Sequence, residues 1–215
     1  MTKTRAATST QVEPPRPAGQ LEPARMESDL ELEGVVITEQ DVSDGGVFDL
    51  SLDGSRLERC RMTGAVFERL SLKDCELVDC ELSGTFLKNV EAERVQFTRC
   101  RMTGAVMTSA AMHHVRFVEC LMQGVNLRMA EGLVLAFDAC DLREVDMYAG
   151  NLTNSTFTSC DLTGAELSNL RLEAARSKVV HSSTYAVRSR CAAAPSPMIW
   201  FFPLYRRCSR TQRSP

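Results

Sequence analysis

The sequence RCRMTGAV occupies residues 59–66 and recurs unchanged at residues 99–106, forty residues later. Steps of five from Leu52 reach 25 positions, of which 23 are Leu, Met or Phe and two are Ala92 and Gly132. The residue two places before each of these centres is small or apolar, and the other three places are mostly polar. A period of five fits neither an α-helix, a β-strand nor a coiled coil. It predicts a stacked solenoid, in which each coil buries its apolar residues against its neighbours.

A second period of twenty is superimposed on the first. Cysteines and phenylalanines recur at this spacing and form two predicted core columns: Cys60, Cys80, Cys100, Cys120, Cys140 and Cys160, and Phe97, Phe117, Phe137 and Phe157. Glycines recur in the same way at Gly64, Gly84, Gly104, Gly124 and Gly164, which suits a corner that needs a permissive backbone. Four units of five therefore make one coil with four sides.

The segments CDLTGAEL at residues 160–167 and NLTNSTF at residues 151–157 carry a family signature. They resemble the repeat A(D/N)LXX of the pentapeptide-repeat family, and the resemblance extends over residues 47–175. It implies an all-β fold, a right-handed quadrilateral parallel β-helix of about six coils. Periodicity alone indicates only a four-sided stack.

The flanks of residues 47–175 differ from the repeats in composition. Residues 1–25 are rich in Pro, Ala, Thr and Ser and are predicted to be disordered. Residues 26–46 are predicted to form an N-terminal cap or a first coil, because Leu32, Ile37, Val42 and Val47 keep the phase of five. Residues 176–215 hold eight basic and no acidic side chains. This irregular tail is either a non-native ending, such as a shifted reading frame would produce, or a native basic tail.

Bulk composition excludes several classes of partner. The net charge is −3, so no global basic field would attract nucleic acid. No apolar run approaches the ~20 residues of a membrane span. The N-terminal residues lack the apolar core of a secretory signal, which predicts a cytoplasmic protein without a membrane or direct nucleic-acid partner.

The sequence offers no catalytic, cofactor or metal site. The cysteine column could suggest a thiophilic metal or redox site, but cysteine also serves as a small core residue, and no C-x₂-C pair is present. His113 and His114 fall at outward positions without a nucleophile in a recognisable order. Phosphate-binding glycine loops and the H-E-x-x-H zinc motif are missing. The sequence therefore predicts a protein that is not an enzyme.

One outward column is apolar. The residue before each centre should face solvent, and on one side these residues are Val66, Phe86 and Val106, followed by Asn126, Asp146 and Glu166. Exposed apolar patches mark contact sites, so Val66, Phe86 and Val106 are a candidate partner surface. The competing interpretation is that residues 21–46 fold over this side and cover it.

Two functions follow from these features. The first is a non-enzymatic interaction or scaffold module whose protein partner and oligomeric state stay open. The second is implied by the resemblance alone: some pentapeptide-repeat proteins mimic duplex DNA, bind DNA gyrase and confer fluoroquinolone resistance. That mechanism needs a dense acidic face, whereas acids outnumber bases by only six to three on the most acidic side. The sequence therefore favours the interaction module.

Overall fold

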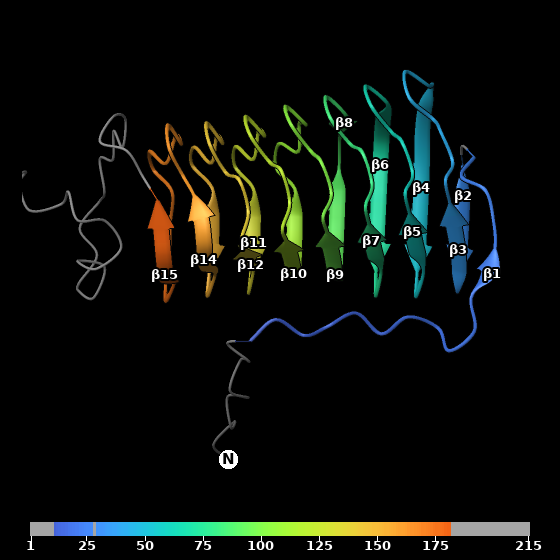
Figure 1. The fold of residues 1–215 in the computed structure, drawn as a ribbon, viewed down its shortest axis with the longest axis horizontal. Helices are drawn as coiled ribbons and strands as arrows, with labels where there is room; N and C mark the ends of the chain where they lie inside the picture. The colour runs from blue at the N-terminus through green and yellow to red at the C-terminus, as the bar shows by residue number, and fades with distance from the viewer. Residues whose placement is uncertain (1–10, 28, 182–215) are drawn as a thin grey trace, which may run out of the picture.

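The computed structural model describes residues 11–27 and 29–181. Within them the chain winds into stacked coils whose strands all pair in parallel, in a single 15-stranded sheet (Figure 1). The strands are β1 (Glu22–Pro23), β2 (Leu30–Glu33), β3 (Val35–Thr38), β4 (Val47–Asp53), β5 (Arg56–Glu58), β6 (Val66–Lys73), β7 (Glu76–Val78), β8 (Phe86–Leu87), β9 (Val90–Thr98), β10 (Ala111–Val118), β11 (Glu131–Leu133), β12 (Ala136–Asp138), β13 (Asn151–Thr153), β14 (Thr156–Asp161) and β15 (Arg176–His181). The predicted all-β parallel helix of about six coils over residues 47–175 is confirmed.

The register of the sheet is twenty residues. Phe97 of β9 pairs with Phe117 of β10, which pairs with Phe137 of β12 and then with Phe157 of β14. The centroids of successive rings in this column are 4.9, 5.1 and 4.9 Å apart, and their planes lie within 10° of parallel. This separation is close to the ~4.8 Å between paired strands, so one ring stacks on the next wherever the coils do.

The predicted cysteine column is also part of the core. All six thiols are buried, and each Sγ lies within hydrogen-bond distance of two backbone carbonyls, as Cys120 does with those of Phe97 and Val118. Thr85 uses its hydroxyl in the same way, donating to the carbonyls of Met62 and Leu82. The inward place two before a centre therefore suits small side chains that can donate to a carbonyl of the coil below.

The corners are the residues two places after each centre, and nearly all of them have a positive φ. Glycine was predicted at the corners, but it is the usual residue in only one of the columns of corners, the one that includes Gly64 and Gly84. Elsewhere the corner holds a side chain in the left-handed region, as at Asp74, Arg99 and Ala139. Asp49 and Arg69 are exceptions because β4 and β6 run through these corners without a turn.

Ala139 offers a test of this corner strain. It is exposed and has a φ of 54°, where an L-residue with a Cβ is disfavoured by roughly 1–2 kcal/mol. Ala139→Gly is therefore expected to raise the free energy of unfolding by about 0.5–1 kcal/mol, after the greater flexibility of glycine in the unfolded chain is subtracted. The control is Ala111→Gly in β10, where φ is not positive and a loss of about 0.5–1 kcal/mol is expected. Urea denaturation of both variants measures the difference, and a loss at both sites would contradict the interpretation.

Val47 does not occupy the centre position that the period of five predicts for it. Val47 pairs with Val66 and Phe48 with Phe67, whereas the register returns to twenty at Asp49 and Arg69. Phe48, not Val47, therefore occupies the centre of this side, with its ring centroid 5.4 Å from that of Phe67. The cause is one extra residue in the turn at Gly45 and Gly46, which a bulge between β4 and β6 absorbs.

The ladder extends beyond residues 47–175 at both ends. β2 and β3 pair with β4 and β5, so residues 30–38 belong to a first coil, which is one of the two alternatives predicted for residues 26–46, and β1 adds a short strand beyond it. At the other end β15 pairs with β14, with Ser177 opposite Phe157. Parallel pairing uses the backbone, so it can continue past residue 175, where the apolar period has ended. Residues 182–215, the rest of the predicted tail, lie outside the described residues.

Residues 11–25 are not placed as a disordered segment. They run in an extended path along one corner of the solenoid, back from β1 toward the middle coils (Figure 1). Backbone N–H groups hold this path, since Ala18 donates to the carbonyl of Gly54 and Ala24 to that of Val36, both at 3.0 Å. Residues 1–10 lie outside the described residues. Within the described part of the chain, no helix has the length and hydropathy that a membrane crossing would need.

Candidate interaction surface

The predicted apolar column exists as a continuous row of neighbours. Val66 at the start of β6 pairs with Phe86 of β8, and Phe86 forms a β-bridge with Val106. The side chain of Phe86 is 49 % exposed, and those of Val66 and Val106 are half-buried. The structure thus brings the three residues together on one side of the solenoid. Hereafter they are called the apolar column.

Polar groups border the apolar column. In the next outward column Lys88 Nζ lies 2.6 Å from Glu68 Oε1. Farther along the rod Arg128 lies 4.5 Å from the centre of the Tyr148 ring and 2.9 Å from Asp146. An apolar centre with a charged rim is the usual anatomy of a protein–protein contact.

The apolar column is not covered by residues 21–46 in the structure. Residues 21–27 lie at a different corner, where Met26 donates its N–H to Gln40 Oε1 and Gln40 Nε2 donates to the carbonyl of Met26. Residues 29–46 form the first coil and pair edge to edge with the second. The predicted cover is therefore wrong for these residues, and Phe86 keeps its exposure.

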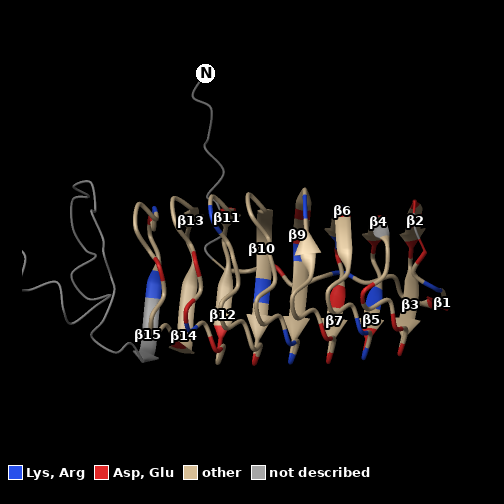
Figure 2. Ribbon diagram, turned by 90° about the horizontal axis from the view of Figure 1, so that it is seen from above, with Lys and Arg blue, Asp and Glu red and all other residues tan. Residues whose placement is uncertain are grey.

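Charges alternate along the N-terminal half of the rod. Residues twenty apart pair as acid and base, including Asp49 with Arg69, Asp53 with Lys73, Asp79 with Arg99, and Glu81 with Arg101. Figure 2 shows acidic and basic segments alternating along the lower row of corners from β3 to β9. Each coil of the N-terminal half thus partly neutralises its neighbour, and this half has no uninterrupted acidic stripe among the described residues. In the C-terminal half acids stand opposite acids, at Asp141 and Asp161 and at Asp146 and Glu166.

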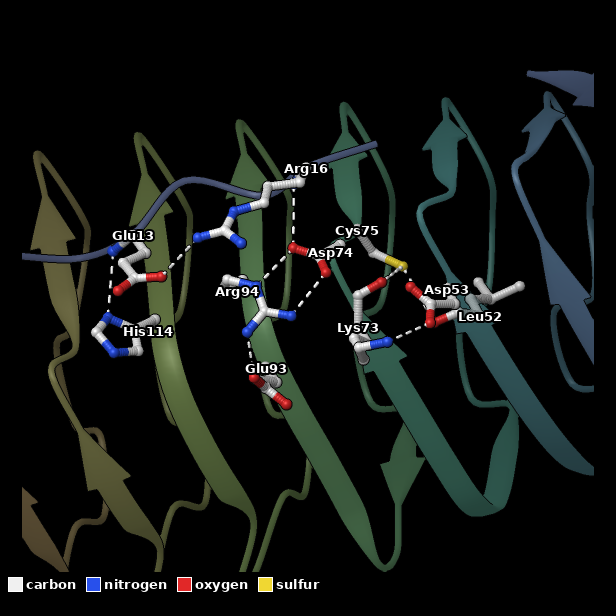
Figure 3. Close-up of polar contacts among 10 residues, drawn as sticks. All are labelled: Glu13, Arg16, Leu52, Asp53, Lys73, Asp74, Cys75, Glu93, Arg94 and His114. Carbon is white, nitrogen blue, oxygen red and sulfur yellow. Dashed lines mark hydrogen bonds and ion pairs between the residues drawn. The ribbon is translucent and has the colours of Figure 1, made fainter. Parts of the chain in front are cut away.

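One ion pair differs from the others in its burial. Arg94 Nε and Nη2 each lie 2.7 Å from a carboxylate oxygen of Asp74, and the two side chains are only 15 % and 12 % exposed. Arg94 also contacts Glu93 (Figure 3). The hydrogen bonds from Arg94 hold the pKa of Asp74 below its ordinary value. The pair was not predicted from the sequence, although its spacing of twenty at one corner was a usable signal.

His114 also has a role that the sequence did not reveal. It occupies the same row of corners as Asp74, two coils farther on, with a φ of 54°. Its Nδ1 accepts a hydrogen bond of 3.2 Å from the N–H of Glu13 (Figure 3). His113, in contrast, is exposed within β10. The two adjacent histidines are therefore not equivalent.

The thiols are enclosed in the core. Burial raises the pKa of Cys75 to about 11. Within the column the direction alternates, because hydrogen bonds between neighbouring thiols raise the pKa of one thiol and lower that of the next: it is raised at Cys60, Cys100 and Cys140 and lowered at Cys80, Cys120 and Cys160. All of these side chains are buried, so a reactive thiolate in the column would have no access to a substrate in solvent. Within residues 11–27 and 29–181, no group of three or more His, Cys, Asp or Glu side chains is arranged to hold a metal ion.

Known proteins match this chain through its repeats. A family model described as the pentapeptide repeat region matches residues 50–127 and 90–167. No curated protein matches the chain. Three solved structures are similar to it. Trypsin-treated QnrB1, described as a plasmid-mediated fluoroquinolone resistance protein, is 14 % identical, with 66 % of this chain and 91 % of that chain covered and a TM-score of 0.31. HetL from Nostoc sp. strain PCC 7120, described as involved in heterocyst differentiation regulation, is 14 % identical, with 69 % of this chain and 75 % of that chain covered and a TM-score of 0.36. Rfr23 from Cyanothece 51142 is 15 % identical, with 69 % of this chain and 63 % of that chain covered and a TM-score of 0.14.

Proposed function

Since the chain belongs to the pentapeptide-repeat family, we propose that it is a non-enzymatic interaction module that binds a protein partner through the apolar column. The observation that carries this proposal is the exposure of Phe86, which lies between Val66 and Val106 on a side that residues 11–27 and 29–46 leave open. Aromatic residues at the centre of an interface often supply a large share of the binding energy.

The rigidity of the scaffold supports this function. Backbone hydrogen bonds join each coil to the next across the whole described ladder, so the side chains of one column keep their spacing. A preorganised surface loses little conformational entropy when it binds. The polar pairs beside the column, such as Glu68 with Lys88, would form the rim of the contact.

The test is capture of a partner from the host's cell extract by the full chain and by two variants. Phe86→Asp should reduce capture at least tenfold, because it removes the central apolar contact and adds a charge. Asn126→Asp adds a charge in the same outward column two coils away and should leave capture unchanged. Equal loss with both variants, or no loss with Phe86→Asp, would assign the partner to another surface.

The alternative function is a DNA-mimic modulator of DNA gyrase. It would need closely spaced anionic groups to compete with a duplex that carries one charge per about 1.7 Å. The acid–base pairs twenty residues apart disfavour this function, because they break up the negative columns in the N-terminal half of the rod. A supercoiling assay with the host's gyrase is expected to show no inhibition up to high excess of the protein. Inhibition at micromolar concentration would favour the mimic.

A further inference from the structure

Residues 11–20, here called the strap, cross successive coils along one row of corners (Figures 1 and 3). Three of its backbone N–H groups donate to this row. Glu13 donates to His114 Nδ1 at 3.2 Å, Arg16 to Asp74 Oδ1 at 3.1 Å, and Ala18 to the carbonyl of Gly54 at 3.0 Å. Gly54, Asp74 and His114 are called the acceptor corner.

The N–H groups left between the prolines of the strap have the same spacing as the acceptors of the acceptor corner. Residues 13–18 read EPPRPA, so only Glu13, Arg16 and Ala18 carry a backbone N–H, and all three are bonded to the solenoid. Proline has no N–H and favours an extended chain that rises about 3.1 Å per residue. The N–H groups of Arg16 and Glu13 are three residues apart, which corresponds to about 9.3 Å in such a chain. Their acceptors, Asp74 and His114, are two coils apart, or about 9.6 Å, so the two spacings agree.

The acceptor corner is built differently from the neighbouring row of corners. Asp74 is buried and held by Arg94, and His114 is half-buried. In the next row Asp79, Arg99 and Glu119 are all exposed, and there Asp79 pairs only with Arg99 among the described side chains. The strap's own side chains contribute little burial, since those of Pro14, Arg16 and Pro17 are exposed. Recognition therefore rests on an extended backbone with prolines between its N–H groups.

The strap can leave without disturbing the solenoid. Three hydrogen bonds to the solenoid hold residues 13–18, whereas residues 22–26 are fixed separately by β1 and by Met26, which is buried. Asp74 would keep both hydrogen bonds from Arg94 after the strap had lifted. Segments with few buried contacts open at low free-energy cost.

We propose that the acceptor corner is a binding site for an extended, proline-interleaved segment of a partner protein, and that the strap occupies this site as a tethered internal competitor. The site is distinct from the apolar column, so it does not depend on a partner at Phe86. A partner segment would need N–H groups spaced as in EPPRPA, and it would displace the strap from Gly54, Asp74 and His114.

The experiment uses the full chain with its strap opened by proline. Glu13→Pro, Arg16→Pro and Ala18→Pro, combined in one variant, remove the three N–H donors and keep the segment extended. The probe is a fluorescein-labelled peptide of residues 11–24, followed by anisotropy. The opened variant should bind it at least tenfold more tightly than the wild type, whose strap competes. Gln20→Pro is the matched control, because the Gln20 N–H makes no hydrogen bond within the described residues; this variant should behave as the wild type.

Variants of the acceptor corner test the assignment of residues. In the opened chain, Asp74→Asn should weaken peptide binding roughly tenfold, as expected for loss of a charged acceptor. His114→Ala should weaken it, and His114→Asn should restore it, because the amide oxygen can accept the same hydrogen bond and asparagine tolerates a positive φ. Asp79→Asn alters an equivalent ion pair in the next row and should have no effect.

Two results of the peptide assay would overturn the proposal, and a third result comes from the oligomeric state. In the first, the opened variant is folded and hydrogen exchange shows that residues 11–20 have been released, yet the peptide does not bind. The second is equal binding of a peptide that carries the three proline substitutions itself, since recognition would then not use the N–H groups. Dimerisation of the wild type by strap exchange, without binding of the free peptide, would also contradict it and assign the corner to a second copy. Arg16→Pro alone, measured in the same way, replaces the triple variant if that variant does not fold.

Discussion

Replacing Phe117 with alanine is expected to lower the free energy of unfolding by about 3–5 kcal/mol. The side chain is fully buried, and its ring stacks between those of Phe97 and Phe137 at 4.9 and 5.1 Å. Alanine would leave a cavity in the middle of the column, and both neighbouring rings would lose a stacking partner. Solenoid coils contact only their neighbours, so a weak coil in the centre separates two halves that can no longer stabilise each other.

Phe86→Ala is the control for this prediction. It removes the same side chain from the same solenoid, but at a position that is 49 % exposed, so a loss of less than about 1 kcal/mol is expected. Urea denaturation followed by circular dichroism compares the two variants. Similar losses at both positions would contradict the view that the stacked phenylalanines, and not apolar content in general, stabilise the central coils.

The repeats made the core predictable from the sequence. A period of five places two of every five side chains inside, and a period of twenty stacks equal residues, so Phe97 and Cys100 could be assigned to columns from the sequence. The apolar column followed from the same rule, because an outward place held Phe86. Whether it binds a partner is a separate prediction that the fold alone does not test.

Three features could not be predicted, each for a physical reason. The shift at Phe48 was hidden because Val47 beside it is also apolar, so both phases satisfied the pattern. The strap was hidden because its contacts use backbone N–H groups, which leave no periodic signal in residue type. The corners were predicted only where glycine stands, although polar residues such as Asp79 take the same positive φ.

Asp74→Asn is expected to cost about 2 kcal/mol of stability, because it leaves the Arg94 guanidinium largely buried without a full negative charge beside it. The solenoid provides a closely matched control in Asp79, which also lies at a corner, has a similar φ of 54° against 52°, and forms two hydrogen bonds with an arginine twenty residues later. Asp79 and Arg99 are 41 % and 51 % exposed, however, so solvent screens them and Asp79→Asn should have a much smaller effect. Equal effects would show that burial does not set the strength of these pairs.

The same pair predicts how stability depends on pH. Arg94 lowers the pKa of Asp74 in the folded protein, whereas in the unfolded chain the carboxyl has its ordinary pKa of about 3.9. The folded state therefore holds the proton less tightly, and the pair contributes its full stabilisation only above that unfolded value. As the pH falls below about 4, protonation removes this contribution, so the stability curves of the wild type and Asp74→Asn should approach each other. Urea denaturation between pH 2.5 and pH 7, on the order of one measurement per half unit, tests this. A constant gap between the two curves would mean that the Asp74 charge is not what stabilises this corner.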